Sequence, residues 1–222
     1  MKKEEFKFIF DMDGTLYSFG KNNHSYDLSP LSNAVRLNSY EFIKKEFQIS
    51  RDEAIKKYNM IVEKYNGETS IGLEKEFGIN RFEYFEKTWT MDPVSLIKKD
   101  EELSELLNVF QGKAALLTGA PKVWTDKVLQ HLGLTNIFQN LIFTGEPDLR
   151  KPNPKIFQTI ANGLGVPTSM IISIGDQLHT DIIPAKQIGM KTIHIGNSMS
   201  VADFTAKNIR EVLLILKMEK FI

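Results

Sequence analysis

The strongest constraint on the fold is a run of strand-forming residues from Phe6 to Phe10. The run ends in two aspartates, Asp11 and Asp13, which are one residue apart. An apolar run of this length is typical of a strand that is buried on both faces of a parallel sheet. Asp11 and Asp13 would then lie just past the C-terminal end of the strand, at the edge where open α/β sheets bind ligands. The run therefore predicts an α/β protein with a polar site at this edge.

The short sequence after the strand favours a cation site. Gly14 follows Asp13 and allows the backbone to turn sharply. Two neighbouring carboxylates repel each other unless a cation joins them or one of them takes a proton. A hard divalent cation with oxygen ligands, Mg²⁺, is the expected partner. The alternative is an ordinary surface turn, because Asp and Gly are both favoured in turns.

Composition removes several classes of function. The 222 residues carry 28 basic and 28 acidic side chains, and this balance gives no global attraction to nucleic acid or to an anionic membrane. The absence of cysteine excludes disulfides, thiolate nucleophiles and zinc–thiolate sites. No stretch approaches the roughly 18 apolar residues that span a bilayer, and the N-terminus does not have the pattern of a signal peptide. We therefore expect a cytoplasmic protein without a membrane partner; the sequence leaves its oligomeric state open.

The order of elements predicts a core with an insertion. Residues 18–92 show helical patterns only, including a capping box from Ser50 to Glu53. After Pro93 strands and helices alternate, which predicts a parallel sheet with right-handed crossovers. We therefore predict a Rossmann-like parallel-sheet core formed by residues 1–17 and 93–222, and an inserted all-helical cap domain formed by residues 18–92. The strands expected after the first are 113–117, 141–144, 170–174 and 191–195. The expected helices of the core include one that starts at Pro121, one at 181–188 and one at 208–218.

Polar residues follow several of these strands and would meet at one edge of the sheet. They include a hydroxyl, an ammonium group and further carboxylates: Asp11, Asp13, Thr118 with Gly119, Lys151, Asp176 and Asp181. Such a set could transfer a phosphoryl group, with a carboxylate as nucleophile and with a cation and hydrogen-bond donors around the phosphoryl oxygens. Taken one at a time, each of these residues has a simpler interpretation. Thr118 could end a strand, Lys151 could be a solvated loop charge, and Asp176 or Asp181 could cap a helix. His179 is interpreted as an exposed loop residue.

At this point the chain resembles the haloacid dehalogenase-like (HAD) hydrolase superfamily along almost its whole length. The first motif is residues 11–15, the second is Thr118, the third is Lys151 with Pro152, and the fourth is residues 175–181. Four motifs in the order of the family, each at a predicted strand end or in the loop after it, form a specific signal. A single motif would not.

The resemblance implies a role for each matching residue. Asp11 would attack phosphorus and form an aspartyl-phosphate, and Asp13 would act as general acid and base. The Asp11 carboxylate, the Asp13 backbone carbonyl and Asp176 would bind Mg²⁺, while Asp181 would bind the metal or lie next to its ligands. The phosphoryl oxygens would be held by the Thr118 hydroxyl, the Gly119 amide and Lys151. Dehalogenating members of the superfamily lack a carboxylate at the position of Asp13, so the resemblance favours a phosphatase.

The predicted cap is similar to that of the subgroup with phosphoglycolate phosphatase, β-phosphoglucomutase and the pyrimidine 5′-nucleotidases. In the nucleotidases, the segment matching Thr69, Ser70 and Gly72 faces the substrate. The leading hypothesis is a Mg²⁺-dependent phosphatase of small phosphate monoesters, including a nucleoside 5′-monophosphate. Alternatives are a phosphoglycolate phosphatase, a sugar phosphomutase of the β-phosphoglucomutase type, and a catalytically silent binding protein. The intact set of polar residues argues against the last.

Overall fold

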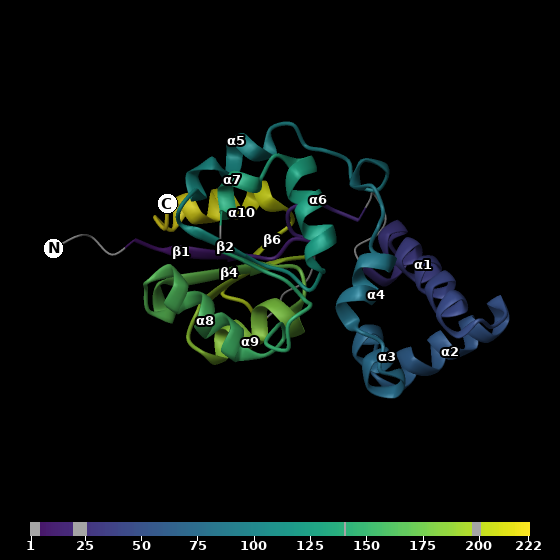
Figure 1. The fold of residues 1–222 in the computed structure, drawn as a ribbon. Helices are drawn as coiled ribbons and strands as arrows, with labels where there is room; N and C mark the ends of the chain where they lie inside the picture. Colours follow the sequence, from purple (N-terminus) through teal and green to yellow (C-terminus); the bar gives the residue numbers. More distant parts are fainter. Residues whose placement is uncertain (1–4, 20–25, 140, 197–200) are drawn as a thin grey trace.

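The computed structural model describes residues 5–19, 26–139, 141–196 and 201–222. In this part of the chain a six-stranded sheet lies between two layers of helices, and a group of four further helices lies beside it (Figure 1). The predicted α/β class with a parallel sheet is confirmed. Among the described residues, no helix is both long and apolar enough to cross a membrane.

The sheet has its first strand near its centre. The strands run in the order β3-β2-β1-β4-β5-β6, and every neighbouring pair is parallel. Their bounds are β1 Lys7–Phe10, β2 Ala114–Leu117, β3 Ile142–Phe143, β4 Ile171–Gly175, β5 Lys191–Ile195 and β6 Phe204–Ala206. At its C-terminal end β1 pairs with both neighbours, Phe10 facing Leu116 in β2 and Ile174 in β4. The loops that follow these three strands therefore start side by side.

Side chains of β1 alternate between two separate apolar cores. Phe8 and Phe10 belong to the larger core and Ile9 to the smaller one, and all three side chains are buried. The larger core lies under α5 (Leu103–Leu107), α6 (Lys122–Leu132), α7 (Thr135–Phe138) and α10 (Ile209–Met218). The smaller core lies under α8 (Pro154–Leu164) and α9 (Ile183–Gln187), on the other face (Figure 1). Burial on both faces explains the continuous apolar character of this strand.

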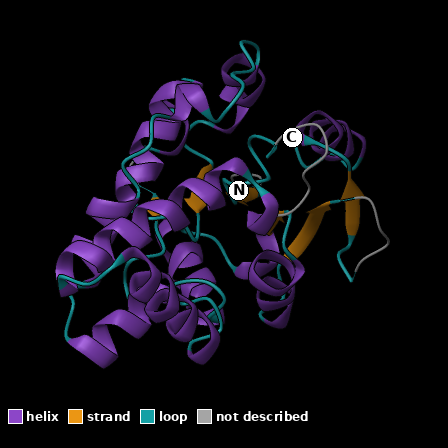
Figure 2. Cartoon of the chain, turned by 90° about the vertical axis from the view of Figure 1, so that its right-hand side faces the viewer, coloured by secondary structure: helices purple, strands orange, loops and turns teal. Residues whose placement is uncertain are grey.

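The inserted helices have an apolar core of their own. They are α1 (Pro30–Phe47), α2 (Arg51–Lys64), α3 (Thr69–Phe77) and α4 (Arg81–Thr88). Their shared core is centred on Ile43, Ile61 and Leu73. Figure 2 shows the strands running across the middle of the molecule, with helices above and below them. The N-terminal part of α1 instead joins the larger core through Leu31 and Val35. The proposed domain boundaries at residues 17 and 93 remain a prediction.

Local signals explain where several helices begin. The predicted capping box of α2 is present: Ser50 Oγ accepts from the Glu53 amide, and the Glu53 carboxylate accepts from the Ser50 amide at 2.9 Å. Pro121 is the residue before α6 rather than its first residue. The helix predicted at 181–188 is a π-helical turn, Leu178–Ile182, followed by α9, in which Pro184 lies in the first turn. Proline is tolerated there because its missing N–H is not needed in the first turn.

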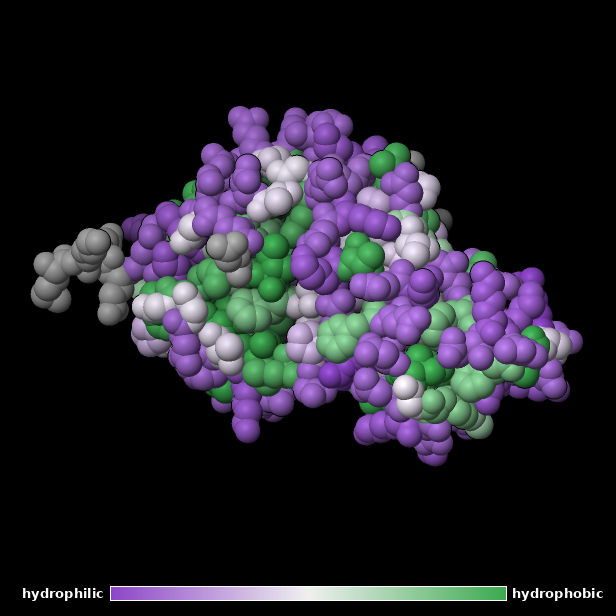
Figure 3. Space-filling view, viewed as in Figure 1, coloured by the Kyte–Doolittle hydropathy of each residue, from purple (hydrophilic) through white to green (hydrophobic). Residues whose placement is uncertain are grey.

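The outer surface is largely hydrophilic on the face shown in Figure 3, with apolar side chains gathered over the middle of the part that contains the sheet. The outline narrows between this part and the helical group. A pocket of about 490 Å³ lies between them, with walls from both sides. This pocket reaches Asp11 and Asp13 at the end of β1.

Candidate active site

Asp11 is held at the C-terminal end of the central strand. Its amide donates to the carbonyl of Ile174 in β4 at 2.9 Å, which continues the sheet pairing by one residue. One carboxylate oxygen accepts from the Thr15 hydroxyl at 2.9 Å, and the other accepts from Lys151 Nζ at 2.6 Å. The side chain is buried apart from the pocket. A carboxylate fixed in this way is suitably placed to act as a nucleophile on a molecule in the pocket.

Lys151 joins two carboxylates. It comes from the loop between β3 and α8, and its ammonium group donates to Asp11 Oδ1 and to Asp181 Oδ1, each at 2.6 Å. Burial alone would lower the pKa of Lys151, but attraction to Asp11 and Asp181 outweighs it and the pKa is raised. Lys151 is therefore a permanent cation at the inner end of the pocket.

Three carboxylates converge beside Lys151. Asp11, Asp176 and Asp181 each present an oxygen, and these oxygens lie within 4.8 Å of one another. Burial, followed by the neighbouring carboxylates, raises the pKa of Asp11 to about 7 and that of Asp176 to about 8. Within the described part of the chain, Asp176 Oδ1 is buried and has no hydrogen-bond partner. An unpartnered oxygen in a cluster of excess negative charge is what a hard divalent cation would satisfy, so this donor set fits Mg²⁺.

Two glycines make room for this cluster. A Cβ atom on Gly14 would lie 2.3 Å from Asp176 Oδ2, and a Cβ on Gly175 would lie 2.3 Å from Asp181 Oδ2. Gly14 also has a φ of +88°, which disfavours other residues. The glycine after the two aspartates is therefore required both by the turn and by the close approach of the loop after β4.

Asp13 lies in a separate hydrogen-bond network. Its Oδ1 accepts from the Trp124 indole N–H at 3.2 Å and from the Tyr17 hydroxyl, and its Oδ2 accepts from the Thr118 hydroxyl at 3.2 Å. Burial raises the pKa of Asp13, although these donors oppose the shift. A buried carboxyl with a raised pKa keeps its proton to a higher pH than a solvated one, which suits a general acid.

Sequence reasoning did not identify Tyr17 and Trp124. Tyr17 lies in the turn that begins at Asp13, where spacing alone could have suggested contact. Trp124 lies in the first turn of α6, directly after the loop containing Thr118, and it is fully buried. Its role as a donor to Asp13 depends on how α6 packs on the sheet, and the sequence carried no signal for that.

Thr118 and Gly119 lie in the loop after β2, as predicted. The Thr118 hydroxyl is buried, donates to Asp13 and accepts from the Ala120 amide at 3.0 Å, so it faces the carboxylate rather than the open pocket. Gly119 lines the pocket. A Cβ on Gly145 would lie 2.0 Å from the Gly119 carbonyl oxygen, so the loops after β2 and β3 touch. The phosphate-binding roles of Thr118, Gly119 and Lys151 remain predictions.

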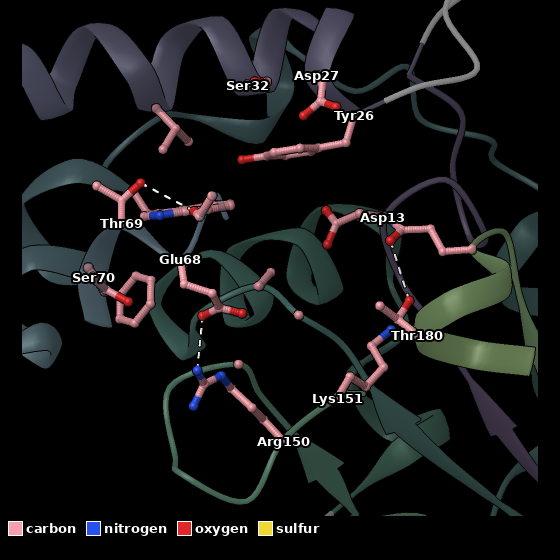
Figure 4. Close-up of a pocket in the computed structure, with 18 of the residues that line it drawn as sticks. Asp13, Tyr26, Asp27, Ser32, Glu68, Thr69, Ser70, Arg150, Lys151 and Thr180 are labelled. Atoms are coloured by element: carbon pink, nitrogen blue, oxygen red, sulfur yellow. Dashed lines mark hydrogen bonds and ion pairs between the residues drawn. The ribbon is translucent and has the colours of Figure 1, made fainter. Parts of the chain in front are cut away.

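The walls of the pocket come from both parts of the molecule (Figure 4). Among the predicted cap residues, Thr69 and Ser70 line it, whereas Gly72 does not. Gly72 is buried between α2 and α3, where an added Cβ would lie 2.5 Å from Ile61 Cγ2. Several aromatic residues also line the pocket: Phe19, Tyr26, Tyr58, Tyr84, Phe85 and Trp89. His179 is exposed, as predicted, and does not line the pocket, but it lies in the π-helical turn Leu178–Ile182 and not in a loop.

The structure brings most of the predicted site residues together. Asp11, Lys151 and Asp181 are in direct contact, and Asp176 lies within the same acidic cluster. Asp181, predicted to bind the metal or to lie beside its ligands, also accepts from the Gln177 amide at 3.0 Å. It therefore organises the turn after β4 as well as pairing with Lys151.

Comparison with known proteins gives one family over most of the chain. Residues 8–189 match the haloacid dehalogenase-like hydrolases. A glyceraldehyde 3-phosphate phosphatase of Pyrococcus furiosus is 27% identical over 210 residues, covering 83% of this chain and 78% of the relative. One of the same name from Methanopyrus kandleri is 33% identical over 108 residues, and that match spans 46% of the relative's length. The pyrimidine 5′-nucleotidase YjjG of Escherichia coli is 24% identical, with 83% of each chain covered.

Solved structures of similar fold align with nearly the whole chain. A HAD phosphatase from Thermococcus onnurineus aligns with a TM-score of 0.66 and 22% identity, covering 95% of this chain and 97% of that one. A 2-haloacid dehalogenase from Pseudomonas syringae aligns with a TM-score of 0.62 and 16% identity, covering 96% of this chain and 99% of that one. At these identities the likeness concerns the fold, which phosphatases and dehalogenases share.

Proposed function

The chain belongs to the haloacid dehalogenase-like hydrolase family, and we propose that it acts there as a Mg²⁺-dependent phosphatase of small phosphate monoesters. The observation that carries the proposal is the contact of Lys151 with Asp11 inside a cluster of three carboxylates, one of which has an unpartnered buried oxygen. A phosphate dianion could approach Asp11 only if positive charge offset these carboxylates. Lys151 supplies part of that charge, and a bound divalent cation would supply the rest.

The residues support a two-step reaction. In the first step an Asp11 carboxylate oxygen forms a bond to phosphorus, the bond from phosphorus to the ester oxygen breaks, and Asp13 gives its proton to the departing alkoxide. In the second step Asp13 takes a proton from water, whose oxygen attacks the phosphorus of the aspartyl-phosphate and releases inorganic phosphate and Asp11. Lys151 stays charged throughout and stabilises the phosphoryl oxygens beside Asp11.

Mg²⁺, held by Asp11, Asp176 and the backbone carbonyl of Asp13, would neutralise charge on the phosphoryl group and orient it for attack. Asp181 would hold Lys151 and the turn that carries Asp176. The presence of Asp13, with its hydrogen-bond donors, supports cleavage of a phosphate ester rather than halide displacement, because an alkoxide needs a proton when it leaves and a halide does not.

The proposed substrates include nucleoside 5′-monophosphates and small sugar phosphates. The relatives from Escherichia coli and Pyrococcus furiosus, each aligned along most of this chain, support these two classes. The aromatic walls of the pocket suit the apolar faces of either. A phosphomutase of the β-phosphoglucomutase type is the second candidate. A mutase would need the aspartyl-phosphate to be protected from water until it phosphorylates a sugar. A pocket with walls from both parts of the molecule could exclude water in this way.

A phosphate-release screen with and without Mg²⁺ tests the proposal. We expect release from at least one nucleotide or sugar phosphate, loss of release with EDTA, and a drop of about 10³-fold or more in kcat for Asp11→Asn. Asp126→Asn, the same change on the exposed side of α6, is the matched control and should keep its activity. Absence of release from every monoester with Mg²⁺ present would overturn the proposal. Interconversion of glucose 1-phosphate and glucose 6-phosphate without release would favour the mutase.

A further inference from the structure

In the outer part of the pocket, away from the acidic cluster, an ion pair joins the two parts of the molecule. Arg150 comes from the core loop after β3, and its Nη2 donates to Glu68 Oε2 of the helical group at 2.9 Å. Both residues line the pocket, and Figure 4 shows Glu68 between Arg150 and the helical wall. Asp11 and the ion pair line the same pocket, so a phosphate ester that reacted at Asp11 would have its leaving group in the space that the pair lines.

The Arg150 guanidinium is already engaged. Besides the Glu68 carboxylate it contacts the carbonyl oxygen of Pro147, to which Nη1 donates at 3.1 Å. Glu68 is the residue before α3, and its side chain makes no capping hydrogen bond to that helix. Its carboxylate is therefore not needed by the helix and is directed to Arg150. An anionic group of a substrate could use Arg150 only by competing with Glu68.

The other charged side chain in this part of the pocket is negative. Asp27 lies across the pocket from Arg150 in Figure 4. Together with Glu68 it gives this described part of the lining two carboxylates against the one guanidinium of Arg150. Lys151, the other cation of the described lining, is committed to Asp11 and Asp181. The other polar residues of this wall are neutral: Ser32, Asn66, Thr69 and Ser70. A carboxylate or a second phosphate would be repelled here, whereas hydroxyl and carbonyl groups could form hydrogen bonds.

We propose that Glu68 determines specificity by its charge, so that the protein selects phosphate monoesters whose leaving group is uncharged and carries hydroxyl or carbonyl groups. Leaving groups with a carboxylate or a second phosphate are rejected. This inference rests on the proposed phosphatase function and deepens it, because it separates substrates that share the reacting group. Phosphoglycolate falls in the rejected class, and nucleoside monophosphates and triose phosphates fall in the accepted one.

Matched substrates test the inference. Glyceraldehyde 3-phosphate and 3-phosphoglycerate differ by an aldehyde in place of a carboxylate, and 2-hydroxyethyl phosphate and phosphoglycolate differ by a hydroxymethyl group in place of a carboxylate. We expect kcat/KM to be higher for the neutral member of each pair by about tenfold or more, the scale of one unfavourable charge contact in a partly solvated pocket. Equal values, or a preference for the carboxylates, would overturn the inference.

Variants of the ion pair give the second readout. Glu68→Gln removes the repelling charge and leaves Arg150 without its carboxylate partner, so the ratio of kcat/KM for the neutral substrate to that for the anionic one should fall by about tenfold. Adding Arg150→Gln to Glu68→Gln should remove most of the gain on anionic substrates. Glu76→Gln is the matched control, because Glu76 is in α3, the helix that Glu68 precedes, and pairs with Lys64 outside the pocket. It should leave the ratio unchanged.

The two proposals fail in different ways. If no monoester, including p-nitrophenyl phosphate, releases phosphate with Mg²⁺, the phosphatase function fails and the specificity inference fails with it. If phosphate is released but Glu68→Gln leaves the ratio unchanged, only the role of Glu68 is overturned. A ratio that changes equally in Glu76→Gln would also overturn it, because the effect would then not come from charge in the pocket.

Discussion

At the scale of single residues, the surroundings of Asp13 differ sharply from those of Asp11. Asp11 is paired with the Lys151 cation, whereas Asp13 is held by the neutral donors Tyr17, Trp124 and Thr118. Burial raises the pKa of both carboxyls; the Lys151 ammonium opposes this rise for Asp11, and hydrogen bonds from neutral donors oppose it for Asp13. The two aspartates of one short motif are thereby suited to two roles, one as nucleophile and the other as acid and base.

Trp124 and Tyr17 should matter most when the leaving group needs a proton. Trp124→Phe or Tyr17→Phe removes a donor that positions Asp13, so kcat/KM for an alkyl phosphate should fall by about tenfold or more. For p-nitrophenyl phosphate, whose leaving group is stable as an anion, the fall should be less than about threefold. Steady-state kinetics on both substrates measure this difference.

A loss of packing alone would lower both rates together, so an equal fall on the two substrates would contradict the positioning role. Tyr65→Phe is the control, because the Tyr65 hydroxyl also donates to a carboxylate, that of Glu76, but lies outside the pocket. Its two rates should stay within about twofold of the unmodified protein, the range expected for a surface substitution.

At the scale of elements, the helical group depends on the close approach of α2 and α3. Gly72 is buried at this crossing. Because it has no side chain, there is room for Ile61 of α2 and for Tyr65, the residue that follows α2. The crossing places the first turn of α3, with Thr69 and Ser70, in the wall of the pocket. Gly72 therefore acts on the pocket through packing between helices.

Gly72→Ala should destabilise the protein, although alanine has the higher helix propensity. The new Cβ would lie 2.5 Å from Ile61 Cγ2 and 2.7 Å from Tyr65 Cδ2, and such overpacking costs about 1–3 kcal/mol. Urea unfolding of Gly72→Ala and of the unmodified protein measures the change in the free energy of unfolding. Gly163→Ala in α8 is the control, since its Cβ would meet its nearest neighbour at 3.5 Å. In Gly163→Ala the free energy of unfolding should rise by about 0.4–1 kcal/mol. A rise of this size in Gly72→Ala would contradict the packing argument.

At the scale of the whole molecule, the acidic cluster couples folding to pH and to metal. Asp11 and Asp176 have pKa values raised to about 7 and about 8 from an ordinary value of 3.8. Between about pH 4 and pH 8, the folded metal-free protein therefore binds more protons than the unfolded chain. The contribution of both groups to stability is complete below about pH 4 and is lost as the pH rises through 7 to 8.

Thermal unfolding with EDTA or with Mg²⁺ should reveal this coupling. With EDTA, the Tm should fall as the pH rises from 6 to 8.5. Mg²⁺ should raise the Tm more at pH 8 than at pH 6, because protons compete with the cation for the same oxygens. At a free Mg²⁺ concentration of about 100 times its Kd, the free energy of unfolding should rise by about 2.7 kcal/mol. Asp176→Asn should largely remove the effect of Mg²⁺, and a shift that did not depend on pH would contradict the coupling.

The sequence was enough to predict the central strand, its neighbours and the edge where the polar residues meet. The parallel sheet and the helical insertion followed from local signals, namely apolar runs, capping residues and glycines at turns. The family followed from the resemblance of four motifs along the chain. The sequence missed β6, a strand of three residues at the edge of the sheet. Edge strands this short carry little apolar pattern, because their pairing with a neighbour rather than their composition makes them strands.

What only the tertiary structure decided is which side chains meet across long separations in the chain. The pairing of Trp124 with Asp13, of Lys151 with Asp181 and of Arg150 with Glu68 joins residues from different helices and loops. Residue type and spacing determined which groups could do chemistry at the end of each strand. The partners of those groups were decided by how helices pack on the sheet and on one another, because a hydrogen bond or an ion pair depends on distance in space and not on distance along the sequence.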